Sequence, residues 1–264
     1  MNGYIQVGHG PQKVLVLGGW LGEAADWIGV VEALDPNAFT FVLFDYRGYG
    51  CSKHLFGTYT FAESADDALR LADHLGWRRF SMIGHSMGGV AIQRILLAAP
   101  ERIEMMVAVN AVPACSARMD LQRLALFESA VGDVTKREII IDTSTGHRLP
   151  RTWLSHRAEC SMDVTTPAAF YGYLKEWATV DFSRLVQGNQ TLVQVITAEF
   201  DPTLTYELME RTWLTWYPNS SAITLANSGH YPMFEVPLAL AASLQSFFHR
   251  ESLRETLNVA NTPD

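Results

Sequence analysis

The sequence predicts an α/β protein in which a mostly parallel, doubly wound sheet carries an inserted helical lobe. Three observations lead to this prediction. Short aliphatic runs alternate with amphipathic segments of helix length over the first 110 residues, the alternation stops between about residues 114 and 181, and it then resumes. The 264 residues, of which 48% are hydrophobic and 18% charged, can form a core of this size and argue against disorder.

The predicted strands are apolar runs that lack the alternation of a half-buried strand. Such runs are typical of parallel strands that helices cover on both faces. In chain order, the runs are Val14–Leu17, Phe39–Phe44, Phe80–Ile83, Met105–Val109, Leu192–Ile196 and Ala222–Leu225.

Helices are predicted between and after these runs. In Phe61–Leu75 the apolar residues recur on one helical face, and Thr60 with Glu63 predicts a capping box at its start. Further helices are predicted over Gly88–Ala99 and over about Val236–Phe248. This rhythm of strands and helices favours a doubly wound sheet.

The interval 114–181 breaks the rhythm. Its one aliphatic run is Ile139–Ile141, and the rest consists of helix-like stretches rich in aromatic and charged residues. We expect a core domain formed by residues 1–113 and 182–264, with a helical lobe inserted between the two parts. From Leu253 onward we expect an irregular tail.

Charge and cysteine usage restrict the function classes. Twenty Lys and Arg against 28 Asp and Glu give a net charge of −8, which disfavours nucleic acid and anionic membranes as partners. The three cysteines lack metal-ligand spacing, and neither a signal peptide nor an apolar run of membrane-spanning length is apparent. We expect a cytoplasmic protein that acts on a small-molecule substrate and needs neither a metal nor a cofactor. The sequence is compatible with a homodimer.

The segment Gly-His-Ser-Met-Gly at residues 84–88 is the sharpest local signal. A serine between two such glycines, after a strand and before a helix, is typical of a nucleophile elbow. Glycines let the strand and the helix approach closely around the strained serine, and the helix N-terminus favours negative charge there. We predict that Ser86 is a nucleophile; a glycine-rich start of a helix without chemistry is the alternative.

A serine nucleophile needs a base, and the base needs an acid that orients it. On this type of sheet the chain order is serine, acid, histidine. His230 follows the last predicted strand and Asp201 follows the one before, so both lie at carboxyl ends of strands, where such sites assemble. Glu199 is a second candidate for the acid of the triad. The alternative for Asp201 is that its side chain only caps the turn before Pro202.

The oxyanion of an acyl-transfer intermediate needs N–H donors. We expect one from the backbone of Met87, which follows the nucleophile. The other is expected from the Gly-Gly-Trp-Leu-Gly loop after the first predicted strand, with Trp20 as first choice and Leu21 as second. The alternative is an ordinary strand-to-helix turn without an oxyanion site, which the same residues would also form.

With these residues in place, the chain resembles the α/β-hydrolase superfamily over nearly its full length. One departure is Gly18, which stands where the family usually has a histidine before the oxyanion glycine. The resemblance implies that the lobe at 114–181 is a cap over the active site. The matching segments are the elbow at Gly84, Ser86 and Gly88, the D-x-R-G-x-G-x-S turn at Asp45–Ser52, the acid turn at Glu199–Pro202 and the histidine loop at Ser228–His230.

Aromatic residues of the lobe and of the site loops predict an apolar pocket. The alternative is that they pack the lobe onto the sheet. The residues expected to bind substrate are Trp20, Trp153, Tyr173, Trp177 and Tyr231.

The function that the sequence predicts is that of a cofactor-independent serine hydrolase. It would cleave a small, moderately apolar carboxylic ester, thioester or lactone through an acyl-enzyme on Ser86. Hydrolysis of a carbon–carbon bond in a diketone-like substrate, with the same triad, is one alternative, and a non-catalytic small-ligand receptor on the same fold is another. Epoxide hydrolysis and dehalogenation are disfavoured, because those relatives have aspartate at the position of Ser86.

Overall fold

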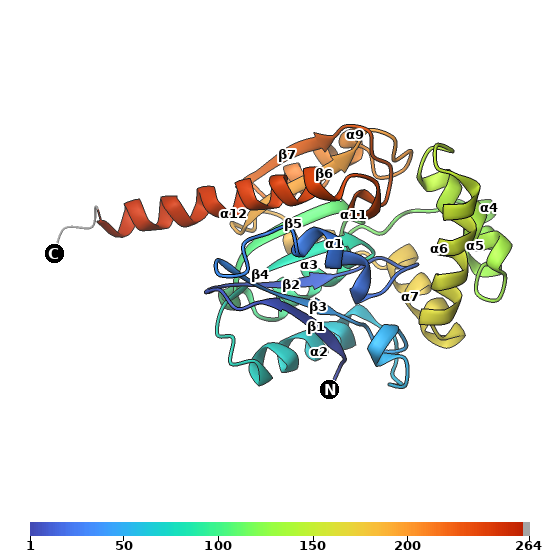
Figure 1. The fold of residues 1–264 in the computed structure, drawn as a ribbon, viewed down its shortest axis with the longest axis horizontal. Coiled ribbons are helices and arrows are strands. Elements are labelled where there is room, and N and C mark those ends of the chain that lie inside the picture. The colour runs from blue at the N-terminus through green and yellow to red at the C-terminus, as the bar shows by residue number, and fades with distance from the viewer. Residues whose placement is uncertain (261–264) are drawn as a thin grey trace.

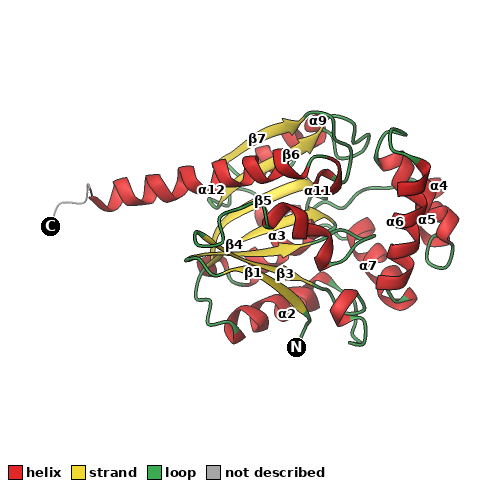
Figure 2. Ribbon diagram, in the orientation of Figure 1, coloured by secondary structure: helices red, strands yellow, loops and turns green. Residues whose placement is uncertain are grey.

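A seven-stranded sheet with helices on both faces forms the body of the molecule (Figures 1 and 2). The structure is a computed structural model that describes residues 1–260, and the side chains of residues 1–249. The strand order is β1-β3-β2-β4-β5-β6-β7, and every neighbouring pair is parallel except the antiparallel pair β1 and β3. The strands are β1 (Tyr4–Gly8), β2 (Gln12–Leu17), β3 (Phe39–Phe44), β4 (Phe80–Ser86), β5 (Ile103–Ala111), β6 (Leu192–Ala198) and β7 (Ser220–Leu225).

The predicted fold class is confirmed, since each of the six predicted runs lies in a strand of this sheet. Strand β1 is not predicted by the sequence. It lies at the sheet edge and is only partly buried, so it carries no continuous apolar run.

The side chains of each inner strand alternate between two cores. In β2, Val14 and Val16 pack in one core, whereas Leu15 and Leu17 pack in the other. Burial on both faces explains why these strands read as continuous apolar runs. Helices α1 and α12 contribute to the first core, and α2 and α3 to the second.

Eight helices of the described chain flank the sheet or follow its strands. They are α1 (Ile28–Val31), α2 (Phe61–His74), α3 (Gly88–Ala98), α8 (Ser183–Val186), α9 (Tyr206–Arg211), α10 (Trp213–Trp216), α11 (Pro232–Glu235) and α12 (Pro237–Ala260). Short 3₁₀ helices lie at η1 (Ala24–Trp27), η2 (Gly50–Ser52) and η3 (Pro100–Arg102). Within residues 1–260, no helix combines the length and the hydropathy that crossing a membrane requires.

Two local predictions need correction. The Thr60 side chain accepts a hydrogen bond from the Glu63 N–H as expected, but the Glu63 carboxylate accepts from the Tyr59 N–H at 3.0 Å, so only half of the capping box forms. The tail expected from Leu253 is helical as far as Ala260, because good helix formers continue without Gly or Pro. The last four residues of that tail, 261–264, lie outside the described residues.

Five helices lie between β5 and β6, and we call the first four of them the cap. Figure 1 shows them together at one end of the sheet. The two chain segments that lead into and out of the cap are bonded to each other, since Phe182 N–H donates to Ala114 O at 2.9 Å. The aliphatic run Ile139–Ile141 lies in the second of these helices. The cap consists of α4 (Leu121–Ser129), α5 (Val134–Ser144), α6 (Arg151–Val164) and α7 (Pro167–Thr179).

A buried arginine joins the cap helices. The Arg137 guanidinium donates to Ser161 Oγ at 3.1 Å, to Thr165 Oγ1 at 3.0 Å and to Ala130 O at 2.9 Å. It also lies 3.6 Å from the centre of the Phe170 ring. Burial lowers the pKa of Arg137 to about 10, so the side chain remains charged at neutral pH.

The passage from β4 to α3 leaves no room for side chains at two glycines. A Cβ on Gly84 would lie 2.5 Å from Gly88 O, and a Cβ on Gly88 would lie 2.3 Å from Leu17 O. Both obstacles are backbone atoms, which cannot rotate away. Between the glycines, Ser86 has a φ of +54°, in the left-handed region that a non-glycine residue rarely adopts.

We expect Gly88→Ala to lower the free energy of unfolding by about 2–3 kcal/mol, because the new methyl group must displace the backbone of β2. Chemical denaturation measures this change. The matched control is Gly29→Ala in α1, where a Cβ would meet no atom within 4 Å. The control should be neutral or stabilising by up to about 1 kcal/mol. Equal stability of the two variants would contradict the close approach described above.

Candidate active site

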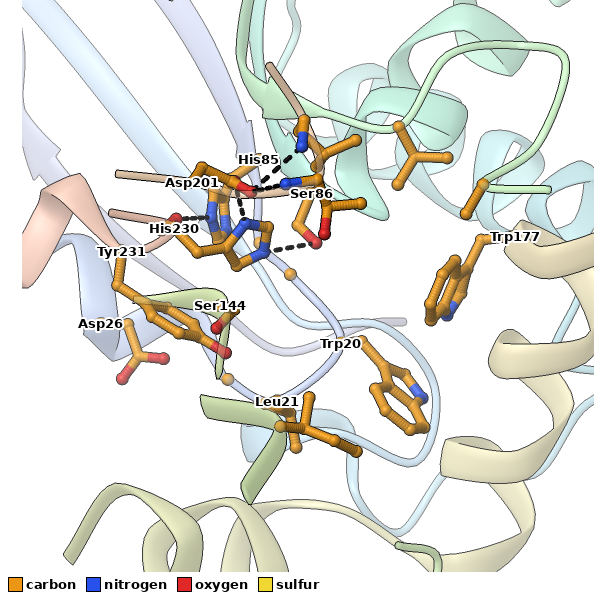
Figure 3. A pocket seen from close by; sticks show the side chains of 18 of the residues that line it. Trp20, Leu21, Asp26, His85, Ser86, Ser144, Trp177, Asp201, His230 and Tyr231 are labelled. Carbon is orange, nitrogen blue, oxygen red and sulfur yellow. Dashed lines mark hydrogen bonds and ion pairs between the residues drawn. The ribbon is translucent and has the colours of Figure 1, made fainter. Parts of the chain in front are cut away.

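Three residues that are far apart in the sequence meet at the carboxyl ends of the strands. Ser86 ends β4, Asp201 follows β6, and His230 lies in the loop after β7. His230 Nε2 lies 3.0 Å from Ser86 Oγ, and His230 Nδ1 lies 2.6 Å from Asp201 Oδ2. Figure 3 shows the imidazole between the carboxylate and the hydroxyl. The structure therefore brings together the three residues proposed for the triad.

Asp201 is fixed by its surroundings. Its side chain is almost completely buried, and Oδ1 accepts hydrogen bonds from Thr203 N–H at 2.9 Å and Leu204 N–H at 3.0 Å. Burial acts to raise the pKa of Asp201, but His230 and these N–H donors outweigh it and hold the pKa below its ordinary value. The turn-capping role considered as an alternative thus coexists with the contact to His230.

The rival carboxylate, Glu199, has a different partner. Its Oε2 accepts from the Asn227 N–H at 2.8 Å. Between them, this bond and the Glu199 N–H bond to Leu225 O tie the acid turn to the end of β7. The described contacts of Glu199 do not include His230.

Two buried polar side chains hold the backbone of the histidine loop, and the sequence analysis does not predict either. His85 Nε2 donates to His230 O at 2.7 Å. Asn110 Nδ2 donates to Gly229 O at 3.1 Å and to His230 O at 3.3 Å. Complete burial lowers the pKa of His85 to about 3, so its ring is neutral at physiological pH. The position of His85 inside the elbow motif was the one signal available.

The cap touches the same loop. Ser144 O, at the end of α5, accepts the backbone N–H of His230 at 3.1 Å. A Cβ on Gly229 would lie 2.7 Å from the Thr145 Cα. The C-terminal end of α5 is therefore part of the scaffold that positions His230.

The loop after β2 lies against the elbow. A Cβ on Gly19 would lie 2.8 Å from His85 Nδ1 and 3.2 Å from Ser86 Cβ. Trp20 follows, and its indole donates to Phe170 O at 2.7 Å and stacks on the Phe170 ring with 3.8 Å between ring centres. Gly19, which directly precedes Trp20, thus lies beside the nucleophile proposed from the sequence.

The other expected oxyanion donor and the departure at Gly18 lie in the same region. Met87 is completely buried and is the N-cap residue of α3, so its N–H belongs to a helix N-terminus. A Cβ on Gly18 would meet no atom closer than Glu23 O at 3.9 Å. The structure thus has space for a Cβ atom at Gly18.

A pocket opens at Ser86 between the sheet and the cap. Its cavity volume is about 70 Å³, so the pocket suits a small ligand. Three of the five aromatic residues expected to bind substrate line it: Trp20, Trp177 and Tyr231. Figure 3 shows Tyr231 on one side of Ser86 and the two tryptophans on the other.

The other two expected pocket residues do not line it. Tyr173 lies one helical turn before Trp177, and there it is completely buried, with its hydroxyl 3.3 Å from Ser64 Oγ. Trp153 packs behind Tyr231, with 6.3 Å between the ring centres. Both therefore take the packing role that the sequence analysis gives as the alternative.

Charged residues that the sequence analysis does not assign to the site also line the pocket: Glu23, Asp26 and Arg123. Asp26 forms an ion pair with Arg157 of the cap at 2.8 Å, and burial raises the pKa of Asp26 in spite of it. Charged residues are common on protein surfaces, so the sequence pattern does not distinguish these pocket residues from solvent-exposed ones. Within the described residues, no group of three or more His, Cys, Asp or Glu side chains could hold a metal ion.

The neutral state of His85 predicts acid sensitivity. In the unfolded chain the pKa of a histidine is 6.5, whereas that of folded His85 is about 3, so the unfolded chain binds one more proton between these values. Stability should therefore fall as the pH drops from 6.5 towards 3, with a contribution from His85 of about 1.4 kcal/mol per pH unit.

His85→Gln should reduce this slope, because the amide can still donate to His230 O but does not titrate. Denaturation at a series of pH values between 4 and 7 measures the slope. His74→Gln, at an exposed position on α2, is the control and should keep the wild-type profile. An unchanged slope in His85→Gln would show that folding does not lower the pKa of His85.

Comparison with known proteins adds the family. A family model described as "alpha/beta hydrolase fold" matches residues 13–237. The serine hydrolase-like protein of Danio rerio is 36% identical over 104 residues, which are 39% of this chain and 31% of that protein. RutD of Caulobacter sp. (strain K31), whose name refers to carbamate hydrolysis, is 36% identical over 112 residues, which are 40% of this chain and 41% of that protein. The chain thus covers less than half of the length of these relatives.

Solved structures share the architecture. An esterase from Exiguobacterium antarcticum superimposes with a TM-score of 0.83 and 18% identity, over 92% of this chain and 94% of that chain. At this identity the likeness concerns the fold. Since the family model spans most of the chain, the resemblance stated from the sequence is confirmed, and the chain belongs to the alpha/beta hydrolase fold family.

Proposed function

We propose that this protein is a serine hydrolase that cleaves a small, moderately apolar carboxylic ester, thioester or lactone. The observation that carries the proposal is the position of His230, 3.0 Å from Ser86 Oγ and 2.6 Å from Asp201. These distances suit proton transfer from the hydroxyl to an imidazole that a carboxylate orients. The names of the esterase and serine hydrolase-like relatives agree with this reaction class.

The proposed reaction has two halves. Ser86 Oγ attacks the carbonyl carbon while His230 Nε2 takes the hydroxyl proton, and His230 then gives that proton to the departing alcohol or thiol. In the second half His230 takes a proton from water as the water oxygen attacks the acyl carbon, and His230 then returns that proton to Ser86 Oγ as the acid departs. Asp201 accepts the His230 Nδ1–H throughout and stabilises the imidazolium. A triad of this kind supplies its own nucleophile and base, so the proposed reaction needs no cofactor.

The backbone N–H groups of Trp20 and Met87 are the proposed donors to the oxyanion. Met87 begins α3, whose N-terminus favours negative charge. The contact of Gly19 with the elbow holds the Trp20 loop beside Ser86. Donors fixed in this way require no rearrangement as charge develops, which is the basis of their catalytic effect.

Labelling with a covalent probe tests whether Ser86 is the nucleophile. A fluorophosphonate probe should label the wild-type protein once, at Ser86, as seen by intact mass and peptide mapping. Ser86→Ala should lose the label and at least about 10⁴-fold in kcat for short-chain aryl esters. Ser129→Ala, at an exposed position of α4, is the control and should keep both. A folded wild-type protein that neither reacts with the probe nor hydrolyses esters would instead favour the small-ligand receptor.

Neutralising each carboxylate in turn separates the two candidate acids, Asp201 and Glu199. Asp201→Asn should lower kcat by about 10³–10⁴-fold, because the amide cannot hold the His230 tautomer that accepts the Ser86 proton. The fold should survive, since the Asn oxygen can still accept from the Thr203 and Leu204 N–H groups. Glu199→Gln should stay close to wild type in the same ester assay. A larger loss in Glu199→Gln than in Asp201→Asn would reverse the assignment.

A further inference from the structure

Arg123 of the cap enters the pocket beside the acid turn. Its guanidinium Nη2 donates to Thr203 Oγ1 at 3.0 Å, and the Thr203 N–H in turn donates to Asp201. The guanidinium also lies 5.5 Å from the centre of the Phe127 ring. Arg123 and Phe127 both line the pocket that contains Ser86. A positive charge is thus held at the wall of the pocket, two hydrogen bonds away from the triad.

This arginine lacks a carboxylate partner. Among the side chains of residues 1–249, no carboxylate lies within salt-bridge distance of Arg123. The nearest acids have other partners, because Asp201 contacts His230, and Asp120 accepts the backbone N–H of Arg123 at 2.7 Å as the N-cap of α4. Burial lowers the pKa of Arg123, and a partly buried charge without a partner is unfavourable.

A second donor lies in the same wall. The Trp177 indole packs edge-on against Phe127, with 5.7 Å between ring centres. Its Nε1 is buried and has no hydrogen-bond partner among the described residues, although most buried polar atoms have one. Arg123, a charged donor without a carboxylate partner, and Trp177, whose indole N–H has no acceptor, therefore line the same pocket.

We propose that Arg123 binds a carboxylate of the substrate, so that the preferred substrates are esters or lactones that carry a second, free carboxylate. The inference rests on the proposed hydrolase function and specifies its substrate class. The planar guanidinium can bind a carboxylate through two hydrogen bonds, and Thr203 fixes its orientation.

Among the other charged residues of the pocket, Asp201 is already bonded to His230 and to backbone N–H groups. Asp26 lies on the opposite side of Ser86 from Trp177 in Figure 3 and is paired with Arg157. Glu23 lines the pocket next to Gly22, three residues before Asp26. Glu23 and Asp26 thus come from the segment after β2, whereas Arg123 comes from α4, and we expect an anionic group to bind at Arg123.

The test compares matched substrates. One pair is 4-nitrophenyl hydrogen glutarate and its neutral methyl ester, which differ in a charge on the acyl part. The other pair is 4-carboxyphenyl butyrate and its methyl ester, which differ in a charge on the alcohol part. In the wild type, kcat/KM for the anionic member of at least one pair should exceed that of its neutral partner by about 10–100-fold, mainly through KM.

Arg123→Gln should bring that ratio to about one. Glutamine can keep the bond to Thr203, so the cap contact is retained while the charge is lost. Arg123→Lys should give an intermediate ratio, because it keeps the charge without the planar fork. Arg151→Gln removes one positive charge from an exposed side chain of the cap, outside the pocket, and should keep the wild-type ratio.

The outcomes separate this inference from the proposed function. Ester hydrolysis without preference for the anionic members, or with a preference that survives in Arg123→Gln, would overturn the carboxylate site and leave the hydrolase intact. If neither esters nor the fluorophosphonate probe react, the hydrolase proposal fails. Calorimetric titration with glutarate then decides the site alone: binding at least about tenfold weaker in Arg123→Gln supports it, and equal or absent binding overturns it.

Discussion

The arrangement of the site depends on how closely two pieces of backbone approach each other at the elbow. Helix α3 begins against β2 at a separation that leaves no volume for a Cβ at Gly88, and β4 meets α3 under the same restriction at Gly84. This contact allows Ser86 to adopt its left-handed conformation and to leave the sheet with its hydroxyl towards His230. Ser86 is the strained residue, and the burial of apolar side chains in the neighbouring strands compensates for the cost of its conformation. Among these side chains, Ile83 and Leu17 are completely buried.

The buried polar groups around His230 form a second, electrostatic constraint. Asp201 keeps its negative charge because backbone N–H groups and the imidazole surround it, whereas His85 is neutral because burial disfavours its charged form. A positive charge on His85 would compete with His230 for the field of Asp201. The neutral ring instead serves as a hydrogen-bond donor that fixes the position of the His230 backbone.

Sequence patterns predict the parts of this protein that follow from local chemistry. The apolar runs fix the inner strands, and glycine spacing around Ser86 fixes the elbow, because each reflects a steric or burial requirement of neighbouring residues. The pocket walls could not be predicted in the same way. Tyr173 and Trp177 share one face of α7, and only the tertiary packing of the cap places the first in the core and the second in the pocket. Edge strand β1 and the pocket residue Arg123 likewise depend on long-range contacts that leave no periodic trace.

The bond between Ser144 O and the His230 N–H has a consequence for how such a protein can evolve. It places the end of one cap helix in the same structural unit as His230, the proposed general base. If the proposed function holds, sequence changes that reshape α5 to admit a different substrate therefore also displace the imidazole proposed to transfer protons. Mutations in α5 that change the substrate range would therefore also change the turnover rate. A cap transferred from another protein would have to re-form the hydrogen bond from the His230 N–H before the enzyme regained its original rate.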